Sequence, residues 1–233
     1  MDLNSEDINI EFNYSFQTGL GVENIMRCIQ KVDVAVMASN INFPEKPLYQ
    51  IGELSFFIIH LDEAINLGLS FYEVIESYDQ YVFESCSKVI DLEKDEFYDS
   101  IKEHYDGGII GSTFCLFGSL AINPSYRGNL LGAKLIKDVI FHYSSACSLF
   151  VLKPFPLQFE GRADEKPKED HQFLGLEQNE VKAKQKLIHY YSKLDFETIE
   201  GIEDLMFLDS SLKNNALERI DLEEFPVIKL KNP

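Results

Sequence analysis

Residues 120–136 read LAINPSYRGNLLGAKLI, and in this stretch a strand pattern changes into a turn and then into a helix. Leu120 to Ile122 are apolar, and Pro124 ends any strand pairing because it has no backbone N–H. From Leu135 onward the apolar residues follow helical spacing. The stretch therefore predicts a strand, a glycine-bearing turn and a helix in direct succession.

The turn carries one cation and two glycines, namely Arg127, Gly128 and Gly132. A helix N-terminus leaves backbone N–H groups unpaired and has a partial positive charge, so it binds phosphate groups well. The two glycines would let a pyrophosphate approach the backbone closely, and Arg127 adds a fixed positive charge. A turn whose glycines serve only the backbone geometry has the same pattern, so the motif alone leaves both interpretations open.

The composition predicts a soluble globular protein with one large core. The chain has 233 residues, of which 45% are hydrophobic and 26% charged. No apolar run is long enough to span a membrane and the first residues are polar, so we expect no membrane partner and a cytoplasmic location. The cysteines have no metal-ligand spacing, which predicts buried thiols and no metal site; they are Cys28, Cys86, Cys115 and Cys147.

The charge is strongly acidic, with 39 acidic against 21 basic residues and a net charge of −18. Because attraction to phosphates dominates nucleic-acid binding, this charge predicts no nucleic-acid partner. An acidic surface attracts cationic molecules, so the expected partner is a small-molecule or peptide amine of cationic character. Solubility alone also explains the negative charge. The sequence leaves open whether the chain forms a homodimer.

Strands and helices alternate along the chain, which predicts an α/β or α+β fold. Alternating or continuous apolar residues predict strands at 7–17, 32–37, 52–61, 109–122, 148–153 and 204–208. Helical spacing predicts further helices at 22–31, 70–89, 91–105 and 181–194. Ser70 and Glu73 have the spacing of a capping box at the start of the second of these helices. Residues 158–178 are poor in apolar side chains and are expected to be exposed.

Three pieces then follow one another: the strand, RGxxxG turn and helix at 115–141, the apolar strand at 148–153, and a helix ending in HYYSKLDFETIEG at 189–201. In this order they resemble the GNAT superfamily of acyl-CoA-dependent N-acyltransferases. Pro124 and Tyr126 precede the turn as in the family's signature, and residues 190–197 are similar to its LYEKxGFE segment. The resemblance covers roughly residues 50–210.

The resemblance implies a GNAT-like mixed central sheet flanked by helices, with two parallel central strands splayed apart. It implies an acetyltransferase domain at 51–210. The residues on either side are expected to form an N-terminal strand and helix extension at 1–50, packed on the core within the same domain, and a C-terminal tail at 211–233. The implied reaction moves an acetyl group from acetyl-CoA directly to a primary amine of a small molecule, a lysine or a protein N-terminus.

The resemblance also implies site residues. In the family, the pantetheine arm lies between the splayed strands and bonds to the backbone at positions matching Leu120, Ala121 and Ile122. Tyr191 matches the tyrosine that protonates the departing thiolate, although it also lies on the apolar face of its helix and fits a core role. The pyrophosphate lies on residues matching Arg127, Gly128, Asn129, Leu130, Leu131, Gly132 and Ala133.

The chain departs from the family pattern at several positions. Leu130 stands where the family prefers glycine, and Asp195 stands where glycine usually precedes the phenylalanine. The strand at 112–119 has no carboxylate to act as general base. This leaves Glu160, Glu103 or His104 acting through water, or an acceptor that arrives already deprotonated. These departures keep a second hypothesis open: a non-catalytic GNAT-like module that binds CoA or a protein partner.

Overall fold

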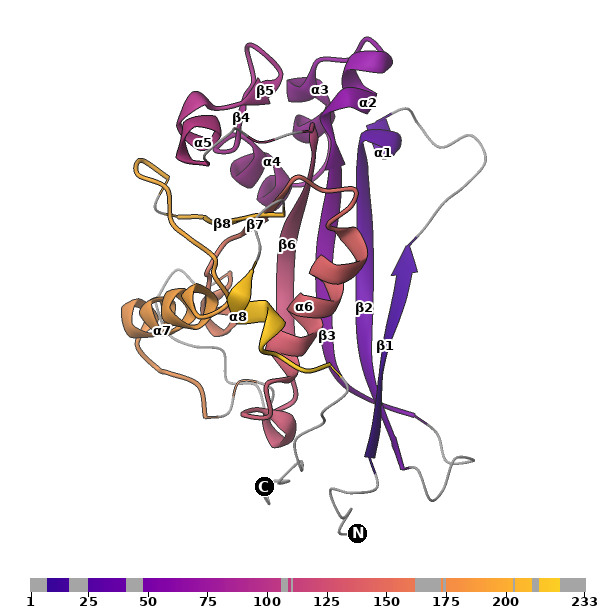
Figure 1. Cartoon of the computed structure of the whole chain (residues 1–233), viewed down its shortest axis with the longest axis vertical. Helices are drawn as coiled ribbons and strands as arrows, with labels where there is room; N and C mark the ends of the chain where they lie inside the picture. Colours follow the sequence, from indigo (N-terminus) through magenta and orange to yellow (C-terminus); the bar gives the residue numbers. More distant parts are fainter. Residues whose placement is uncertain are drawn as a thin grey trace.

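The computed structural model describes residues 8–16, 25–40, 48–105, 109, 111–161, 173, 175–202, 204–210 and 214–222. Within these residues, six strands form one mixed sheet in the order β1-β2-β3-β6-β7-β8 (Figure 1). Helices cover both faces of the sheet. The predicted fold class, an α/β fold with a mixed central sheet flanked by helices, is confirmed.

The first four strands of the sheet are antiparallel neighbours, namely β1 (Ile8–Phe16), β2 (Ile29–Asn40), β3 (Tyr49–His60) and β6 (Thr113–Ile122). The last two are β7 (Leu149–Leu152), which is parallel to β6, and β8 (Met206–Asp209), which is antiparallel to β7. A small hairpin lies apart from this sheet and consists of β4 (Ile90–Asp91) and β5 (Glu96–Phe97).

Most of the helices are short. They are α1 (Ile25–Cys28), α2 (Leu61–Asn66), α3 (Phe71–Glu76), α4 (Gln80–Cys86), α5 (Asp99–His104) and α8 (Asn215–Glu218). The two long ones are α6 (Leu131–Tyr143) and α7 (Glu180–Ser192). Two 3-10 turns, at Pro124–Tyr126 and Leu157–Phe159, follow β6 and β7 respectively.

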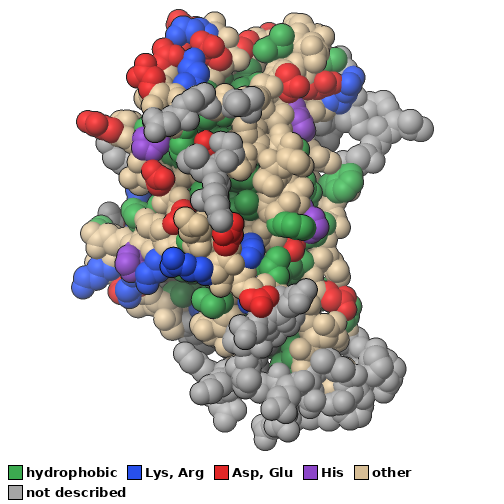
Figure 2. Space-filling view, viewed as in Figure 1, with side chains coloured by type: hydrophobic (Ala, Val, Ile, Leu, Met, Phe, Trp, Pro, Cys, Tyr) green, Lys and Arg blue, Asp and Glu red, His purple; other side chains and the backbone are tan. Residues whose placement is uncertain are grey.

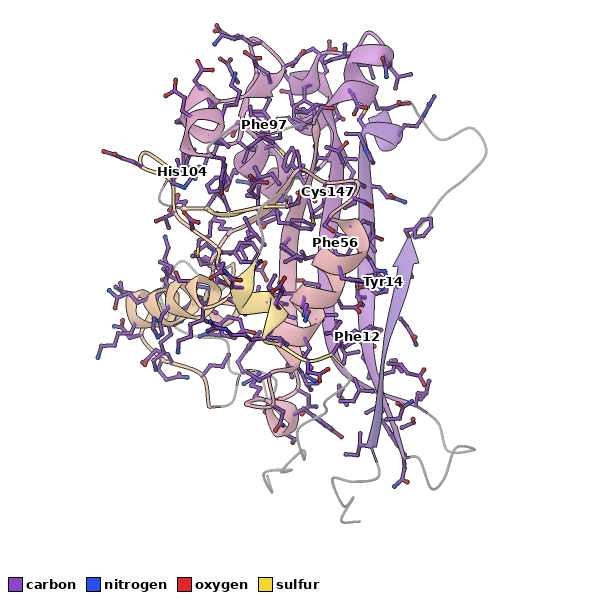
Figure 3. All side chains as sticks on the ribbon, in the orientation of Figure 1. Phe12, Tyr14, Phe56, Phe97, His104 and Cys147 are labelled. Atoms are coloured by element: carbon purple, nitrogen blue, oxygen red, sulfur yellow. The ribbon has the colours of Figure 1, made fainter. Side chains whose placement is uncertain are left out.

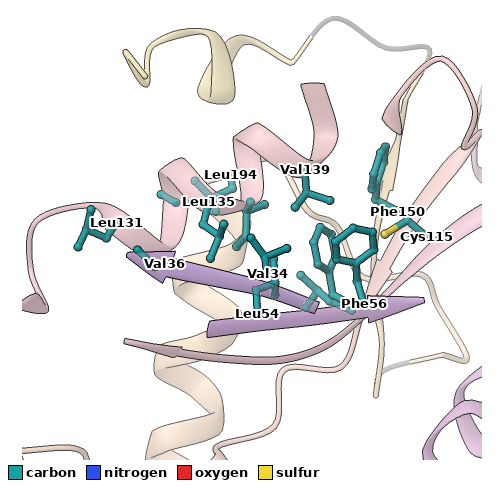
Figure 4. Packing of buried hydrophobic residues seen from close by; sticks show 14 of the residues in the cluster. Val34, Val36, Leu54, Phe56, Cys115, Leu131, Leu135, Val139, Phe150 and Leu194 are labelled. Atoms are coloured by element: carbon teal, nitrogen blue, oxygen red, sulfur yellow. The ribbon is translucent and has the colours of Figure 1, made fainter. Parts of the chain in front are cut away.

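Successive side chains of a strand point to opposite sides of the sheet, and a separate hydrophobic cluster covers each side. Both faces of the sheet are therefore buried. On one face, Val34 and Phe56 pack with Leu135 and Val139 of α6 (Figure 4). On the other face, the strand residues Phe57, Ile59, Phe114 and Leu116 pack in one cluster with residues of α2 to α5, among them Phe71 and Val74 of α3. This double burial explains the uninterrupted apolar run at residues 56–59.

Three predicted helices are wrong in extent. The helix at 22–31 is only Ile25–Cys28 among the described residues, because the chain from Ile29 pairs with β3 instead. The helix at 70–89 is two helices, and Asp79 begins the second by accepting a hydrogen bond from the Val82 N–H at 2.8 Å. The helix at 91–105 is a hairpin followed by α5.

The capping box is also wrong. Ser70 precedes α3, but its side chain makes no capping hydrogen bond. Asp95 supplies the bond instead, since its Oδ1 accepts from the Phe71 N–H at 3.2 Å. A backbone N–H at the start of α3 therefore has its acceptor in a side chain of the β4–β5 hairpin.

The parallel strands β6 and β7 pair over only four residues, from Phe114 with Leu149 to Phe117 with Leu152. Strand β7 then ends, whereas β6 continues to Ile122 with β3 as its neighbour. Two prolines follow β7, and a proline cannot donate a hydrogen bond to a ladder. The predicted splay of the parallel central strands therefore begins after Phe117.

Candidate functional site

A β-bulge marks the point where β6 leaves β7. Phe117 pairs with Phe56 and Leu120 with Leu54, so β6 has one residue more than β3 in this interval. The hydroxyl of Ser55 fills the irregularity, because it accepts a hydrogen bond from the Ser119 N–H at 3.2 Å. A Cβ on Gly118 would lie 2.7 Å from that hydroxyl, which is why a glycine stands there. The bulge thus bends β6 where it loses a neighbour.

A cavity of about 470 Å³ opens where the two strands part. Its walls are the second half of β6, the turn before α6, the segment after β7, and α7. This volume is in the usual range for small-molecule sites. Of the predicted site residues, those that line it are Leu120, Ala121, Ile122, Arg127, Gly128, Leu130, Leu131, Gly132 and Tyr191.

The backbone of β6 presents polar groups to this cavity. The Asn123 N–H donates to the Ile51 carbonyl at 2.8 Å, so Asn123 faces β3. Because hydrogen-bonding direction alternates along an antiparallel strand, Ala121 also faces β3, whereas Leu120 and Ile122 face the cavity side. The Ile122 carbonyl accepts from Nε of Arg127 at 2.8 Å. Leu120 is therefore the predicted residue whose N–H and C=O both face the gap.

Two of the predicted site residues do not line the cavity but help to hold the turn in place. Asn129 donates from Nδ2 to the Tyr126 carbonyl at 3.1 Å, and its side chain does not line the cavity. The side chain of Ala133 is buried in the core beneath α6. Burial lowers the pKa of Arg127, whose Nε holds the end of β6 to the turn. The turn is therefore held in place by its own side chains.

The start of α6 faces the cavity with unpaired N–H groups. The first backbone bond at this end runs from the Lys134 N–H to the Leu130 carbonyl at 2.9 Å, so the N–H groups of the three residues between have no acceptor inside the helix. Gly128 has φ +84°, a conformation that glycine adopts without strain. A Cβ on Gly132 would lie 3.0 Å from the hydroxyl of Tyr190.

Leu130 occupies the position before α6 in a left-handed conformation, with φ 59° and ψ 8°. This conformation costs a residue with a Cβ about 1–2 kcal/mol. Its side chain is 58% exposed and stands at the cavity wall rather than in the packing between helix and sheet. Leu130 is therefore both strained and placed where it narrows the approach to α6.

Tyr191 reaches the cavity from the last turn of α7. Its ring lies 6.2 Å from the ring of Phe196, which lies 6.2 Å from that of Phe117, so aromatic contacts connect it to the point where the strands part. Burial raises the pKa of Tyr191 to about 12. Within the described ranges, no group hydrogen-bonds its hydroxyl. The cavity wall therefore holds a protonated phenol that is available to a ligand.

A hydroxyl group that the sequence did not predict lies where β6 and β7 part, on the α4 side of the sheet. The hydroxyl of Tyr81 donates to the Phe117 carbonyl at 2.5 Å. Lys153 directly follows β7 and lines the cavity, and its Nζ lies 3.7 Å from Oε2 of Glu84. Lys153 and Glu84 are far apart in the sequence, so no local pattern could have paired them.

The general bases that the sequence left open lie outside the cavity. His104 lies on α5 (Figure 3), and its Nε2 is 3.1 Å from the carboxylate of Glu197. The neighbouring Glu103 is exposed on the same helix. Glu160 is exposed after the second 3-10 turn. None of these three residues lines the cavity.

The four cysteines are buried, as the sequence predicts, and none of them forms a disulfide bond. Within the residues that the structure describes, no group of three or more His, Cys, Asp or Glu side chains is arranged to hold a metal ion. No helix in the described part of the chain is both long enough and apolar enough to cross a membrane.

No family model matches the chain, and no curated protein matches its sequence. Three solved chains are similar to it in structure. One is from the KacTA–DNA complex, with 9% identity, a TM-score of 0.42, and coverage of 90% of this chain and 96% of that one. The second, AtaTR bound with AcCoA, has 12% identity, a TM-score of 0.38, and coverage of 91% and 97%. The third, a tyrosine-to-phenylalanine mutant of KacT, has 11% identity, a TM-score of 0.40, and coverage of 91% and 98%.

At such low TM-scores and identities, no activity or site residue is transferred from these proteins to this chain. The expected partners are nevertheless corrected. Net charge excluded nucleic acid in favour of a small-molecule or peptide amine, but one similar chain stands in a complex with DNA. The net charge of a whole chain does not describe each of its faces. Figure 2 shows basic side chains gathered over α7, where Lys182, Lys186, His189 and Lys193 share one exposed face.

Proposed function

We propose that this protein is a GNAT-type acyltransferase that moves an acetyl group from acetyl-CoA to an amine. The observation that carries the proposal is the parting of β6 and β7 at a bulge, which opens a cavity bounded by a strand edge, a helix N-terminus and a phenol. These three groups suit the three parts of an acyl-CoA: an amide-bearing arm, a pyrophosphate and a thioester. Acetyl-CoA, when bound, supplies an activated acyl group.

The edge of β6 suits the pantetheine arm. Leu120 directs a backbone N–H and a C=O toward the gap, and an extended strand edge recognises an amide-bearing chain as it recognises another strand. Ile122 contributes less because its carbonyl already accepts from Arg127. Ala121 lines the cavity while its backbone faces β3.

The start of α6 suits the pyrophosphate. Leu131 and Gly132 offer N–H groups at the positive end of the helix dipole, and Gly132 carries no Cβ between the backbone and the ligand. Arg127 adds a positive charge beside the same turn. Because Arg127 and Asn129 already hold the turn, binding orders few groups and loses little entropy.

Tyr191 suits the role of general acid. With a pKa of about 12 its hydroxyl stays protonated at neutral pH, and it can donate that proton to a departing thiolate. The apolar surroundings that raise the pKa of Tyr191 also raise that of a thiol, which eases the transfer. Tyr190 is a poorer candidate because its hydroxyl lies over Gly132, at the helix end of the cavity.

Calorimetric titration of the full chain tests the proposal. We expect CoA and acetyl-CoA to bind, and pantetheine to bind more weakly because it lacks the pyrophosphate that α6 attracts. Equal affinities for CoA and pantetheine would remove the turn from the site. No binding of CoA at millimolar concentration would overturn the proposal as a whole.

A further inference from the structure

Lys153 places a primary amine where the central strands part. It is the residue after Leu152, the last residue of β7 that pairs with β6, and it lines the cavity. The other cavity lysine, Lys186, is mostly exposed, and its Nζ lies 2.6 Å from the carboxylate of Glu177. Of these two amines, Lys153 is the one beside the strand ends.

The Lys153 amine also has a carboxylate within reach. Its Nζ lies 3.7 Å from Oε2 of Glu84, and the two side chains are 28% and 46% exposed. Gln80 donates from Nε2 to the other oxygen of Glu84 at 2.7 Å, which fixes the carboxylate on α4. Tyr81 ties the same helix to the Phe117 carbonyl. An ammonium and a proton acceptor therefore lie together beside the end of β7, where the central strands part.

We propose that Lys153 is a self-acetylation site of this chain, a proposal that rests on the acetyl-CoA-dependent function proposed above. Glu84 takes one proton from the Lys153 ammonium, and the resulting amine forms a C–N bond to the acyl carbon. The C–S bond to CoA breaks, and Tyr191 gives its proton to the sulfur. The second proton leaves the nitrogen and restores the Tyr191 hydroxyl through water. The products are Nε-acetyl-Lys153 and free CoA.

Acetylation changes the site in two ways. It removes the positive charge of Lys153, and with it the ion pair to Glu84. It also adds an acetyl group to a side chain that lines the cavity. The added group leaves less room for an external amine, so the modification is expected to limit the enzyme's own turnover.

Mass spectrometry of peptides after incubation with acetyl-CoA tests the proposal. We expect Lys153 to gain an acetyl group at least about tenfold faster than Lys193, an exposed lysine directly after α7 that reports unassisted chemistry. The first-order rate constant for acetylation of Lys153 is expected not to depend on protein concentration, because the bound donor and the acceptor lie in one molecule. Lys153→Arg keeps the charge and removes the site, and Glu84→Gln is expected to slow the reaction at least about tenfold.

A second measurement does not depend on acyl transfer. Lysines are labelled by reductive methylation with formaldehyde and cyanoborohydride in the presence and absence of unacylated CoA, and we expect CoA to protect Lys153 but not Lys193. Equal acetylation of the two lysines, or equal labelling of Lys153 with and without CoA, would overturn the self-acetylation proposal in a chain that binds CoA. Failure to bind CoA at all in the titration would instead show that the proposed function itself is wrong.

Discussion

The two halves of β6 belong to one strand but have different surroundings. From Phe114 to Phe117 the strand has a neighbour on each side, and its side chains are almost completely buried. From Gly118 to Ile122 it pairs with β3, and its residues are only partly buried. The first half of β6 is therefore core, whereas the second half is cavity wall.

This difference shows how a binding surface is made from a core strand. Backbone N–H and C=O groups must find partners, and β7 supplies them up to Phe117. Beyond that point the groups of Leu120 are left for water or a ligand, since leaving them unpaired in an apolar site costs free energy. We therefore expect the first half to determine stability and the second half to determine binding.

The largest expected effect concerns the phenol beside the second half. Tyr191→Phe is expected to lower turnover by about 10²–10⁴-fold, because the proposed proton donor is lost. Stability and CoA affinity are expected to change little, since no described group hydrogen-bonds its hydroxyl. Steady-state kinetics with release of CoA as the readout measure the loss, and Tyr190→Phe is the matched control. Unimpaired turnover would assign the proton to another group.

The next effect tests the two halves directly. Leu116→Ala, in the paired half, is expected to lower the free energy of unfolding by about 2–5 kcal/mol, because it leaves a cavity in the core. Leu120→Ala, in the splayed half, is expected to cost only about 1 kcal/mol because its side chain is partly exposed. Urea unfolding measures both values. Equal losses would contradict the division of β6 into core and cavity wall.

Arg127→Glu tests whether the turn after the second half of β6 contributes to CoA binding. We expect the Kd for CoA to rise about tenfold or more, because a positive charge near the pyrophosphate is replaced by a negative one. Arg127→Lys separates two contributions, since it keeps the charge and loses the Nε bond to Ile122. Arg27→Glu, on the short helix α1, is the matched control. A Kd unaltered by Arg127→Glu would remove that residue from the phosphate site.

The smallest effect concerns Leu130. Leu130→Gly relieves left-handed strain of about 1–2 kcal/mol, but the glycine loses about 0.5–1 kcal/mol more entropy on folding, so stability is expected to rise by less than about 1.5 kcal/mol. The exposed side chain no longer narrows the approach to α6, so CoA is expected to bind a few-fold more tightly. Titration and thermal unfolding measure the two values. Weaker binding would indicate that Leu130 packs on the ligand.

The sequence predicts those parts of the molecule that local signals determine. Pro124, the glycines of the turn and the apolar spacing after Leu135 are enough to predict the end of β6 and the helix α6. Of the predicted phosphate positions, Asn129 and Ala133 do not line the cavity. Spacing along the chain does not reveal that one side chain bonds the turn and the other packs beneath the helix.

The remaining features depend on contacts between distant residues. Ile29 belongs to a strand because it pairs with Ile59, and the start of α3 is capped by Asp95, which lies 24 residues further along the chain. The pair formed by Glu84 and Lys153 depends in the same way on how α4 sits against the end of β7. No period or motif within one segment contains this information.

The second half of β6 gives the sheet an edge in its interior, in addition to the outer edges at β1 and β8. Outer strand edges invite other chains to add to them, and proteins protect such edges with charges, prolines or covering loops. This inner edge is protected by its surroundings, because Tyr191 of α7 and the turn at Arg127 close on it from two sides. The proposed ligand carries amide groups along its arm, so it can pair with this inner edge as an added strand would.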